Sequence, residues 1–265
     1  MTPWIISFLA MTCAVETPVE VIAHRGESAD APENTMAAFR LAWERQVDGF
    51  ELDVHLTEDG QLAVLHDADT KRTAGQKKVV KQTPWAELRD LDVGRWKDER
   101  FTGERIPLLA DVLRQIPAGI RCFVEVKVGP EAIPALVEAV RTSGKPPEQL
   151  VVISFHAETV AEAKRRLPEL KAYYLSSFKR NAETGEVRPT VDALIAEAKR
   201  IRADGLNVSF EGPIDAEFVR RVKDAGLKFY VWTVDDEQVA KRLAGLGVDG
   251  ITTNKAAWLR NALSR

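Results

Sequence analysis

Short apolar runs alternate with amphipathic stretches along most of the chain, and the apolar runs are rich in β-branched residues. Runs of about four to eight such residues are typical of buried strands, whereas apolar positions three or four apart are typical of helices. This pattern predicts eight strands, at residues 19–23, 49–55, 122–128, 150–155, 172–175, 206–209, 228–233 and 248–252. It also predicts a helix after each strand, at residues 35–45, 108–116, 132–142, 158–167, 190–200, 215–225, 236–246 and 256–263.

The regular alternation of strands and helices predicts a parallel sheet built from βαβ units. Eight such units in 265 residues fit a closed barrel, so we expect an α/β fold, a (β/α)8 TIM barrel over residues 19–265 with a small inserted subdomain after strand 2. The alternative is an open doubly wound sheet. The barrel is favoured because no Gly-x-Gly-x-x-Gly motif follows a predicted strand.

The interval between the second and third barrel strands is too long for an ordinary connection. It contains a short apolar run at residues 61–65, followed by polar segments rich in Lys, Asp, Gly and Thr. Long excursions within a compact domain are more often functional than accidental. We therefore expect residues of about 67–107 to form an insertion that lies over the mouth of the barrel.

Composition and charge exclude several classes of protein. Hydrophobic residues make up 45% of the chain, which excludes a disordered or collagen-like chain and a polytopic membrane protein. With 37 Lys and Arg against 40 Asp and Glu, the net charge is −3, so we expect no nucleic-acid partner and no stable membrane insertion. The two cysteines, Cys13 and Cys122, predict no disulfide framework and no thiolate metal site, and Cys122 lies in an apolar run typical of a buried thiol.

The first residues of the chain form an apolar segment that is too short to span a bilayer. Residues 1–15 have the length of a signal-peptide core, with small residues suited to cleavage after Ala14, which predicts a periplasmic or secreted protein. The start carries no Lys or Arg, however. The alternative is therefore an apolar extension packed on the domain of a cytoplasmic protein.

Polar side chains occur where several predicted strands end. Glu51 and Asp53 are two residues apart in one strand and therefore point to the same face, and Glu125 lies in the next barrel strand. Buried carboxylates are costly unless they are paired or bind a metal. Three of them from two strands form the oxygen-rich type of site that holds one divalent cation, Mg²⁺ or Ca²⁺.

Two cations and two histidines accompany these carboxylates. Arg25 follows His24 at the end of the first strand, Lys127 shares a face with Glu125, and His66 follows the apolar run at residues 61–65. A metal with Arg and Lys suits the charge that develops on phosphate oxygens, and two histidines suit general acid and base near neutral pH. Together they predict cleavage of a phosphodiester. The other histidines, His55 and His156, are better explained as structural.

The ordered motifs resemble those of the glycerophosphodiester phosphodiesterase family over about residues 19–254. They are His24-Arg25-Gly26, Glu33-Asn34-Thr35, Glu51-Leu52-Asp53, His66-Asp67, Glu125-Val126-Lys127 and Trp232-Thr233. The resemblance implies a (β/α)8 barrel with an inserted subdomain. It also implies metal-dependent hydrolysis of a small-molecule glycerophosphodiester substrate to glycerol 3-phosphate and an alcohol.

The resemblance also implies roles for individual residues. The implied metal ligands are Glu51, Asp53 and Glu125, the acid/base pair is His24 and His66, and the phosphate contacts are Arg25 and Lys127. Trp232 looks like part of an apolar wall beside the glycerol or alcohol part of the substrate, and Phe155 is a weaker candidate for the same wall. The alternative interpretation of Trp232 is a tryptophan buried in the core. Glu33 and Asn34 match a supporting position, although Asn34 also fits a helix cap.

The chain departs from the family pattern after its last strand. Where the family usually has Thr-Asp-x-Pro, this chain has Thr253-Asn254-Lys255-Ala256, which loses a charge and a proline at the expected rim of the substrate site. Two further alternatives keep the barrel. One is a lysophospholipase D-like or phosphoinositide phosphodiesterase, and the other is a non-catalytic barrel that binds phosphorylated ligands.

Overall fold

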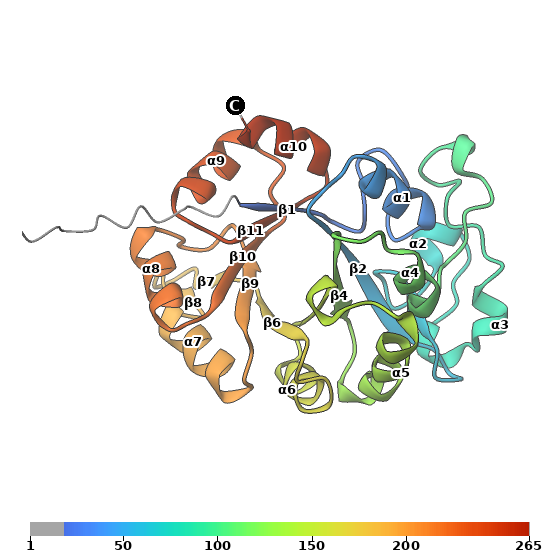
Figure 1. Ribbon diagram of the computed structural model, residues 1–265, viewed down its shortest axis with the longest axis horizontal. Coiled ribbons are helices and arrows are strands. Elements are labelled where there is room, and N and C mark those ends of the chain that lie inside the picture. Colours follow the sequence, from blue (N-terminus) through green and yellow to red (C-terminus); the bar gives the residue numbers. More distant parts are fainter. Residues whose placement is uncertain (1–18, 265) are drawn as a thin grey trace, which may run out of the picture.

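The computed structural model describes residues 19–264, and these form a closed barrel of eight parallel strands (Figure 1). The barrel closes because the first strand pairs with both the last strand and the second, with Ile22 opposite Thr252 on one side and Gly49 on the other. The predicted TIM barrel is therefore confirmed. Its strands are β1 (Glu20–Ala23), β2 (Gly49–Leu56), β4 (Arg121–Val126), β5 (Leu150–Ser154), β6 (Lys171–Ser176), β9 (Gly205–Ser209), β10 (Lys228–Trp232) and β11 (Gly250–Thr253).

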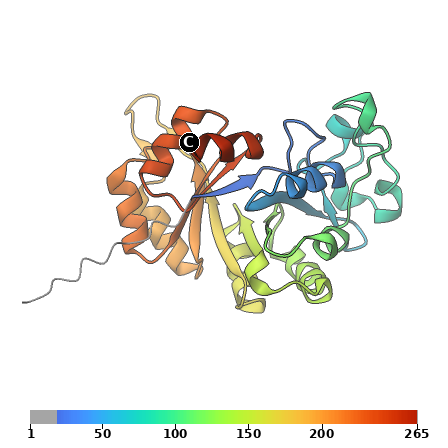
Figure 2. The same ribbon diagram turned by 45° about the horizontal axis from the view of Figure 1, so that its top comes forward.

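Helices surround the barrel and cover the outer face of its strands (Figures 1 and 2). Their apolar faces and the outward side chains of the strands form one large hydrophobic core, in which the rings of Phe39 and Phe50 lie 5.1 Å apart. Burial of this apolar surface is the main stabilising contribution to the fold. The helices are α1 (Met36–Glu44), α4 (Leu109–Gln115), α5 (Ile133–Ser143), α6 (Ala157–Arg166), α7 (Val191–Arg200), α8 (Ala216–Asp224), α9 (Glu237–Gly245) and α10 (Ala256–Leu263).

The inside of the barrel is filled by side chains at the end where the strands begin. Arg121 lies over the Phe123 ring, 5.0 Å from its centroid, and donates hydrogen bonds to Glu20 and to the Tyr230 hydroxyl (3.0 Å). Tyr173 and Tyr230 stack in the same layer with centroids 5.0 Å apart. This packed, internally paired layer leaves the opposite end, where the strands finish, for a binding site, as is usual for this fold.

The segment between β2 and α4 forms a small unit of its own. β3 (Leu62–Val64) pairs antiparallel with β2, and the short helices α2 (Lys71–Ala74), η1 (Val80–Gln82), α3 (Trp85–Leu88) and η2 (Glu99–Phe101) follow. Its apolar side chains, among them Leu65, Leu88 and Ile106, pack together in a separate cluster. Both views place this unit beside α1 and α4 at one side of the barrel (Figures 1 and 2). This differs from the expectation that it lies over the mouth. Its apolar side chains cluster with Ala63 of β3, and β3 pairs antiparallel with β2.

The structure adds elements that the hydrophobic pattern did not predict. A two-stranded hairpin, β7 (Lys179–Arg180) and β8 (Val187–Arg188), follows β6, and its side chains are mostly exposed. Short 3-10 turns, η3 (Pro130–Ala132) and η4 (Pro147–Gln149), precede α5 and β5. Exposed polar strands lack the apolar alternation on which such predictions depend.

Three remaining expectations concern the N-terminus, the membrane and Cys122. The candidate signal peptide and Cys13 lie outside the described residues. Among the residues that are described, no helix has the length and apolar character needed to cross a membrane. Cys122 is fully buried, as expected.

Candidate active site

A pocket of about 220 Å³ opens where the barrel strands end. Seven of the eight residues that the sequence singles out as the site line it: His24, Arg25, Glu51, His66, Glu125, Lys127 and Trp232. The eighth, Asp53, is buried next to them in β2. Within the described part of the chain, residues 67–107 contribute nothing to this lining. The sequence-predicted residues thus converge on one pocket, and the insertion lies beside that pocket.

Three carboxylates meet at the base of the pocket. Asp53 in β2 lies directly opposite Glu125 in β4, and Glu51 precedes Asp53 on the same face of β2. Glu51, Asp53 and Glu125 are only 3%, 1% and 9% exposed, and each offers an oxygen within 4.8 Å of the others. Glu51 Oε1 is buried without a hydrogen-bond partner, and Asp53 Oδ1 accepts no hydrogen bond but lies 3.3 Å from Lys127 Nζ. An all-oxygen donor set with an orphaned buried oxygen fits a hard divalent cation.

The protein alone does not neutralise this cluster. Burial, followed by the charges of Asp53 and Glu125, raises the pKa of Glu51 well above its ordinary value. Burial and the charge of Asp53 likewise raise the pKa of Glu125 to about 7. For Asp53, burial works in the same direction, but the cations Arg25 and Lys127 outweigh it and lower the pKa. Two of the three carboxyls therefore resist ionisation in the absence of further positive charge.

Arg25 and Lys127 form the cationic side of the site. The Arg25 backbone N–H donates to Glu51 Oε2 (2.9 Å), and its guanidinium lies 3.2 Å from Asp53 Oδ2 and 2.9 Å from Glu33 Oε1. Lys127 Nζ lies 2.7 Å from Glu125 Oε1 and 3.3 Å from Asp53 Oδ1. These contacts hold both cations at the edge of the carboxylate cluster, facing the pocket that they line.

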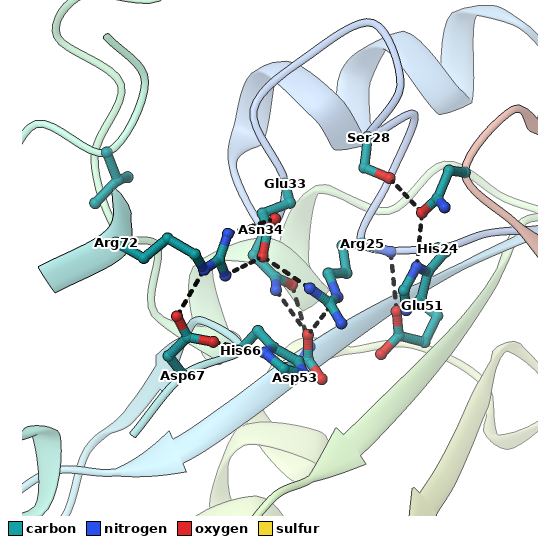
Figure 3. A network of polar contacts seen from close by, with 12 residues as sticks. His24, Arg25, Ser28, Glu33, Asn34, Glu51, Asp53, His66, Asp67 and Arg72 are labelled. Carbon is teal, nitrogen blue, oxygen red and sulfur yellow. Dashed lines mark hydrogen bonds and ion pairs between the residues drawn. The ribbon is translucent and has the colours of Figure 1, made fainter. Parts of the chain in front are cut away.

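The turn after β1 brings Asn34 into the site. The Asn34 amide donates to Asp53 Oδ2 (2.8 Å) and accepts from the Asp53 backbone N–H (3.1 Å), which fixes the Asp53 carboxylate (Figure 3). Asn34 has a φ of +58°, a conformation that Asn tolerates better than most residues. The alternative interpretation of Asn34 as a helix cap is wrong, because Thr35 caps α1 by accepting from the Ala38 N–H.

The two histidines have different hydrogen-bond partners. His66 Nδ1 lies 2.7 Å from Asp67 Oδ1, whereas His24 Nδ1 lies 2.7 Å from the amide oxygen of Asn254. Burial, together with the charge of Arg25, lowers the pKa of His24 to about 4. Burial opposes the ionisation of Asp67, but hydrogen bonds from Arg72 and His66 and the charge of Arg72 together outweigh it and lower the pKa of Asp67 to about 2. His66 thus faces a firmly ionised carboxylate, and His24 faces a neutral amide.

A residue of the inserted unit reaches this network, and sequence reasoning missed it. Arg72 in α2 donates to Asp67 Oδ2 (2.7 Å) and to both Glu33 oxygens (2.9 and 2.7 Å), as Figure 3 shows. Glu33 in turn binds Arg25. Arg72 therefore links the partner of His66 to the partner of Arg25. One Arg among many in a charged segment gives no sequence signal for this position.

The other side of the pocket is largely apolar. The rings of Trp232 and Phe155 lie 5.7 Å apart, edge to face, and both line the pocket. Asn207 in β9 also lines it, is 2% exposed, and has no hydrogen-bond partner at Oδ1. Asn207 was not among the predicted site residues, although a polar residue in an otherwise apolar strand was a signal for it.

The other histidines satisfy backbone groups. His55 Nε2 lies 2.9 Å from the His66 carbonyl oxygen, and His156 Nε2 lies 3.3 Å from the Lys127 carbonyl oxygen. Neither lines the pocket, as the described residues define it. This placement agrees with the structural interpretation of both side chains.

Comparisons with known proteins agree with the site. The model of the glycerophosphoryl diester phosphodiesterase family matches residues 24–257. A glycerophosphodiester phosphodiesterase of Caldanaerobacter subterraneus subsp. tengcongensis is 36% identical over 92% of this chain and 98% of its own length. A glycerophosphodiester phosphodiesterase of Bacillus subtilis is 30% identical over 88% of this chain and 82% of its own length.

Solved structures with a fold similar to that of this chain are also phosphodiesterases. An Oleispira antarctica phosphodiesterase, solved in complex with the product sn-glycerol-3-phosphate, is 29% identical, with a TM-score of 0.83 over 94% of this chain and 98% of that chain. A glycerophosphodiester phosphodiesterase of Parabacteroides distasonis is 28% identical, with a TM-score of 0.76 over 93% of this chain and 97% of that chain. The chain therefore belongs to the glycerophosphoryl diester phosphodiesterase family and is a phosphoric diester hydrolase.

Proposed function

We propose that the enzyme hydrolyses glycerophosphodiesters to glycerol 3-phosphate and an alcohol in a metal-dependent reaction, with His24 and His66 as base and acid. The observation that carries this proposal is the buried Glu51–Asp53–Glu125 cluster with an orphaned oxygen on Glu51, beside two cations and two histidines. The glycerol 3-phosphate bound by the similar Oleispira antarctica enzyme supports the assignment of the product.

Glu51, Asp53 and Glu125 would hold one divalent cation, Mg²⁺ or Ca²⁺. When bound, such an ion neutralises charge on the phosphate oxygens and relieves the repulsion among the three carboxylates. Arg25 and Lys127, which already lie against the cluster, bind the remaining phosphate oxygens and orient the diester. The phosphate is thereby held between the carboxylate base of the pocket and the two histidines.

The two histidines suit opposite proton transfers. His24 is neutral near pH 7 because its pKa is lowered, so it accepts a proton from the attacking water as the water oxygen bonds to phosphorus. His66 is bonded through Nδ1 to the ionised Asp67, which orients its ring, and we assign it the donation of a proton to the leaving alkoxide as the other P–O bond breaks. The products are glycerol 3-phosphate and the free alcohol.

The small pocket supports a short substrate. Trp232 and Phe155 provide an apolar wall for the carbon atoms of the glycerol or alcohol, and Asn207 offers a free acceptor for a hydroxyl group. A pocket of about 220 Å³ suits a water-soluble glycerophosphodiester better than a lysophospholipid with its long acyl chain. The family match also favours glycerophosphodiesters over the lysophospholipid and phosphoinositide alternatives.

The experiment compares glycerophosphocholine, lysophosphatidylcholine and a glycerophosphodiester with a p-nitrophenyl leaving group, each with Mg²⁺ or Ca²⁺. We expect glycerol 3-phosphate from the first substrate and little reaction with the second. His66→Ala should lower kcat about 10²-fold or more on glycerophosphocholine and much less on the p-nitrophenyl diester, whose leaving group needs no proton. His24→Ala should be slow on both. Unimpaired turnover of glycerophosphocholine by either variant contradicts the acid/base roles. Faster turnover of lysophosphatidylcholine than of glycerophosphocholine contradicts the substrate assignment.

A further inference from the structure

Asn254, the residue at which the chain departs from the family pattern, forms side-chain hydrogen bonds at the rim of the pocket. It follows β11 directly, and its side-chain amide lies between His24 and Asp235. Its Oδ1 lies 2.7 Å from His24 Nδ1 and accepts from the Ser28 hydroxyl (3.0 Å). Its Nδ2 donates to Asp235 Oδ2 (2.6 Å).

Asp235 fixes the direction in which this amide points. Burial opposes its ionisation, but hydrogen bonds from the Asn254 amide and the Thr253 hydroxyl outweigh burial and lower the pKa of Asp235. The Asn254 backbone N–H donates to the same carboxylate (2.8 Å). An ionised carboxylate only accepts hydrogen bonds, so the NH₂ end of the Asn254 amide must face Asp235. The oxygen end must then face His24.

This orientation determines which ring nitrogen of His24 carries the proton. An amide oxygen can only accept, so the contact at 2.7 Å requires a hydrogen on His24 Nδ1. A neutral imidazole has one N–H, and its Nε2 is therefore the free lone pair. That nitrogen is the only ring atom of His24 able to take a proton in the pocket.

We propose that Asn254, anchored by Asp235, is a positioning residue that holds His24 in its Nδ1–H tautomer and so presents Nε2 as the base. This inference rests on the proposed role of His24 as the base. A carboxylate at position 254 could accept from Nδ1 as well, but it would lie against the ionised Asp235 and would favour the charged imidazolium. The amide instead provides an acceptor without charge, which suits a ring that must stay neutral until it takes the proton.

The tautomer is measured directly by NMR on the full chain labelled with ¹⁵N-histidine. The His24 signals are identified as those that disappear in His24→Gln. Above neutral pH, we expect a pyrrole-type Nδ1 and a pyridine-type Nε2 in the wild-type protein. Asn254→Leu removes the acceptor at similar volume and should shift the ring toward the Nε2–H form, lower kcat about 10²-fold, and change KM about threefold or less. A wrong tautomer of the catalytic histidine costs about 10⁴ in kcat in the Ser-His-Asp triad, which sets an upper limit.

Ser28→Ala is the matched control, because it removes a different contact to the same amide oxygen and leaves His24 bonded. It should preserve the tautomer and keep kcat within about threefold. If Asn254→Leu does not fold, Asp235→Asn releases the amide to rotate and should give a mixture of tautomers. A wild-type Nε2–H signal, or an Asn254→Leu variant with an unchanged tautomer, overturns the proposal. The NMR readout needs no turnover, so an active His24→Ala enzyme with the expected tautomer would refute the base role and still support the positioning by Asn254.

Discussion

The carboxylate cluster should make the metal-free enzyme less stable than a variant that cannot bind metal. Glu125 is almost fully buried, and its pKa is raised to about 7 by burial and by Asp53. The unfolded chain ionises this carboxyl near its ordinary value of 4.5, whereas the metal-free folded protein does so only near 7. The free energy of unfolding of the metal-free protein therefore falls as the pH rises from about 4.5 to about 7. Above that range the loss is complete.

The size of this effect follows from the pKa. A difference of about 2.5 units at about 1.36 kcal/mol per unit gives roughly 3 kcal/mol at about pH 8. Glu125→Gln removes the charge at nearly constant volume but weakens the 2.7 Å contact with Lys127, which costs about 1 kcal/mol. The variant should thus be about 2 kcal/mol more stable than the metal-free wild type, or about 4 °C higher in Tm at about 2 °C per kcal/mol.

The assay is thermal unfolding of the wild type and Glu125→Gln at about pH 8, after chelation and again with added Mg²⁺ or Ca²⁺. The variant should melt higher without metal, and its advantage should shrink at about pH 5. Metal at about 100 times its Kd should stabilise the wild type by about 2.7 kcal/mol and the variant far less, so that the order reverses. A variant that melts lower than the metal-free wild type refutes the electrostatic reasoning, as does equal stabilisation of both proteins by metal.

Two further substitutions test the framework around the site. Gly26→Ala should lower stability by about 2–4 kcal/mol, measured as a drop in Tm, because its Cβ would lie 2.7 Å from Ala38 at a φ of +79°. Gly60→Ala is the control, with a φ of +78° and open space around it, and it should lose about 1 kcal/mol. Equal losses at both positions would contradict the steric argument. Arg72→Gln should lower kcat about tenfold, because it frees Asp67 and Glu33, the partners of His66 and Arg25. Its Tm should change little, because the guanidinium is partly exposed. An unchanged kcat would show that this link does not position His66 or Arg25.

The strands and the metal-ligand candidates were predictable because both depend on short-range patterns. Glu51 and Asp53 share a face through the two-residue period of a strand, and the βαβ alternation places β2 beside β4. Once the barrel is assumed, all strand ends meet at one mouth, so His24, Glu125 and Lys127 converge without further information.

The missed features depend on contacts that no local pattern encodes. Arg72 reaches Glu33 across 39 positions, and Asn254 reaches His24 across 230, through the closure of the barrel between β1 and β11. The departure at Asn254 suggested a change at the rim of the substrate site, but the loss of charge there bears on the tautomer of a histidine instead. The insertion lies to one side, where its apolar residues cluster with one another and with Ala63 of β3. The number of polar residues in the segment does not indicate this placement.

The central claim is that a divalent cation on Glu51, Asp53 and Glu125 is required to cleave a glycerophosphodiester. The most direct measurement is the release of glycerol 3-phosphate from glycerophosphocholine by chelated enzyme, before and after Mg²⁺ or Ca²⁺ is restored, with Glu51→Gln treated in parallel. We predict that chelation abolishes release, that metal restores it to the wild type, and that Glu51→Gln stays at least about 10²-fold slower at every metal concentration. Full release by the chelated enzyme, or a Glu51→Gln variant as active as the wild type, would contradict the claim.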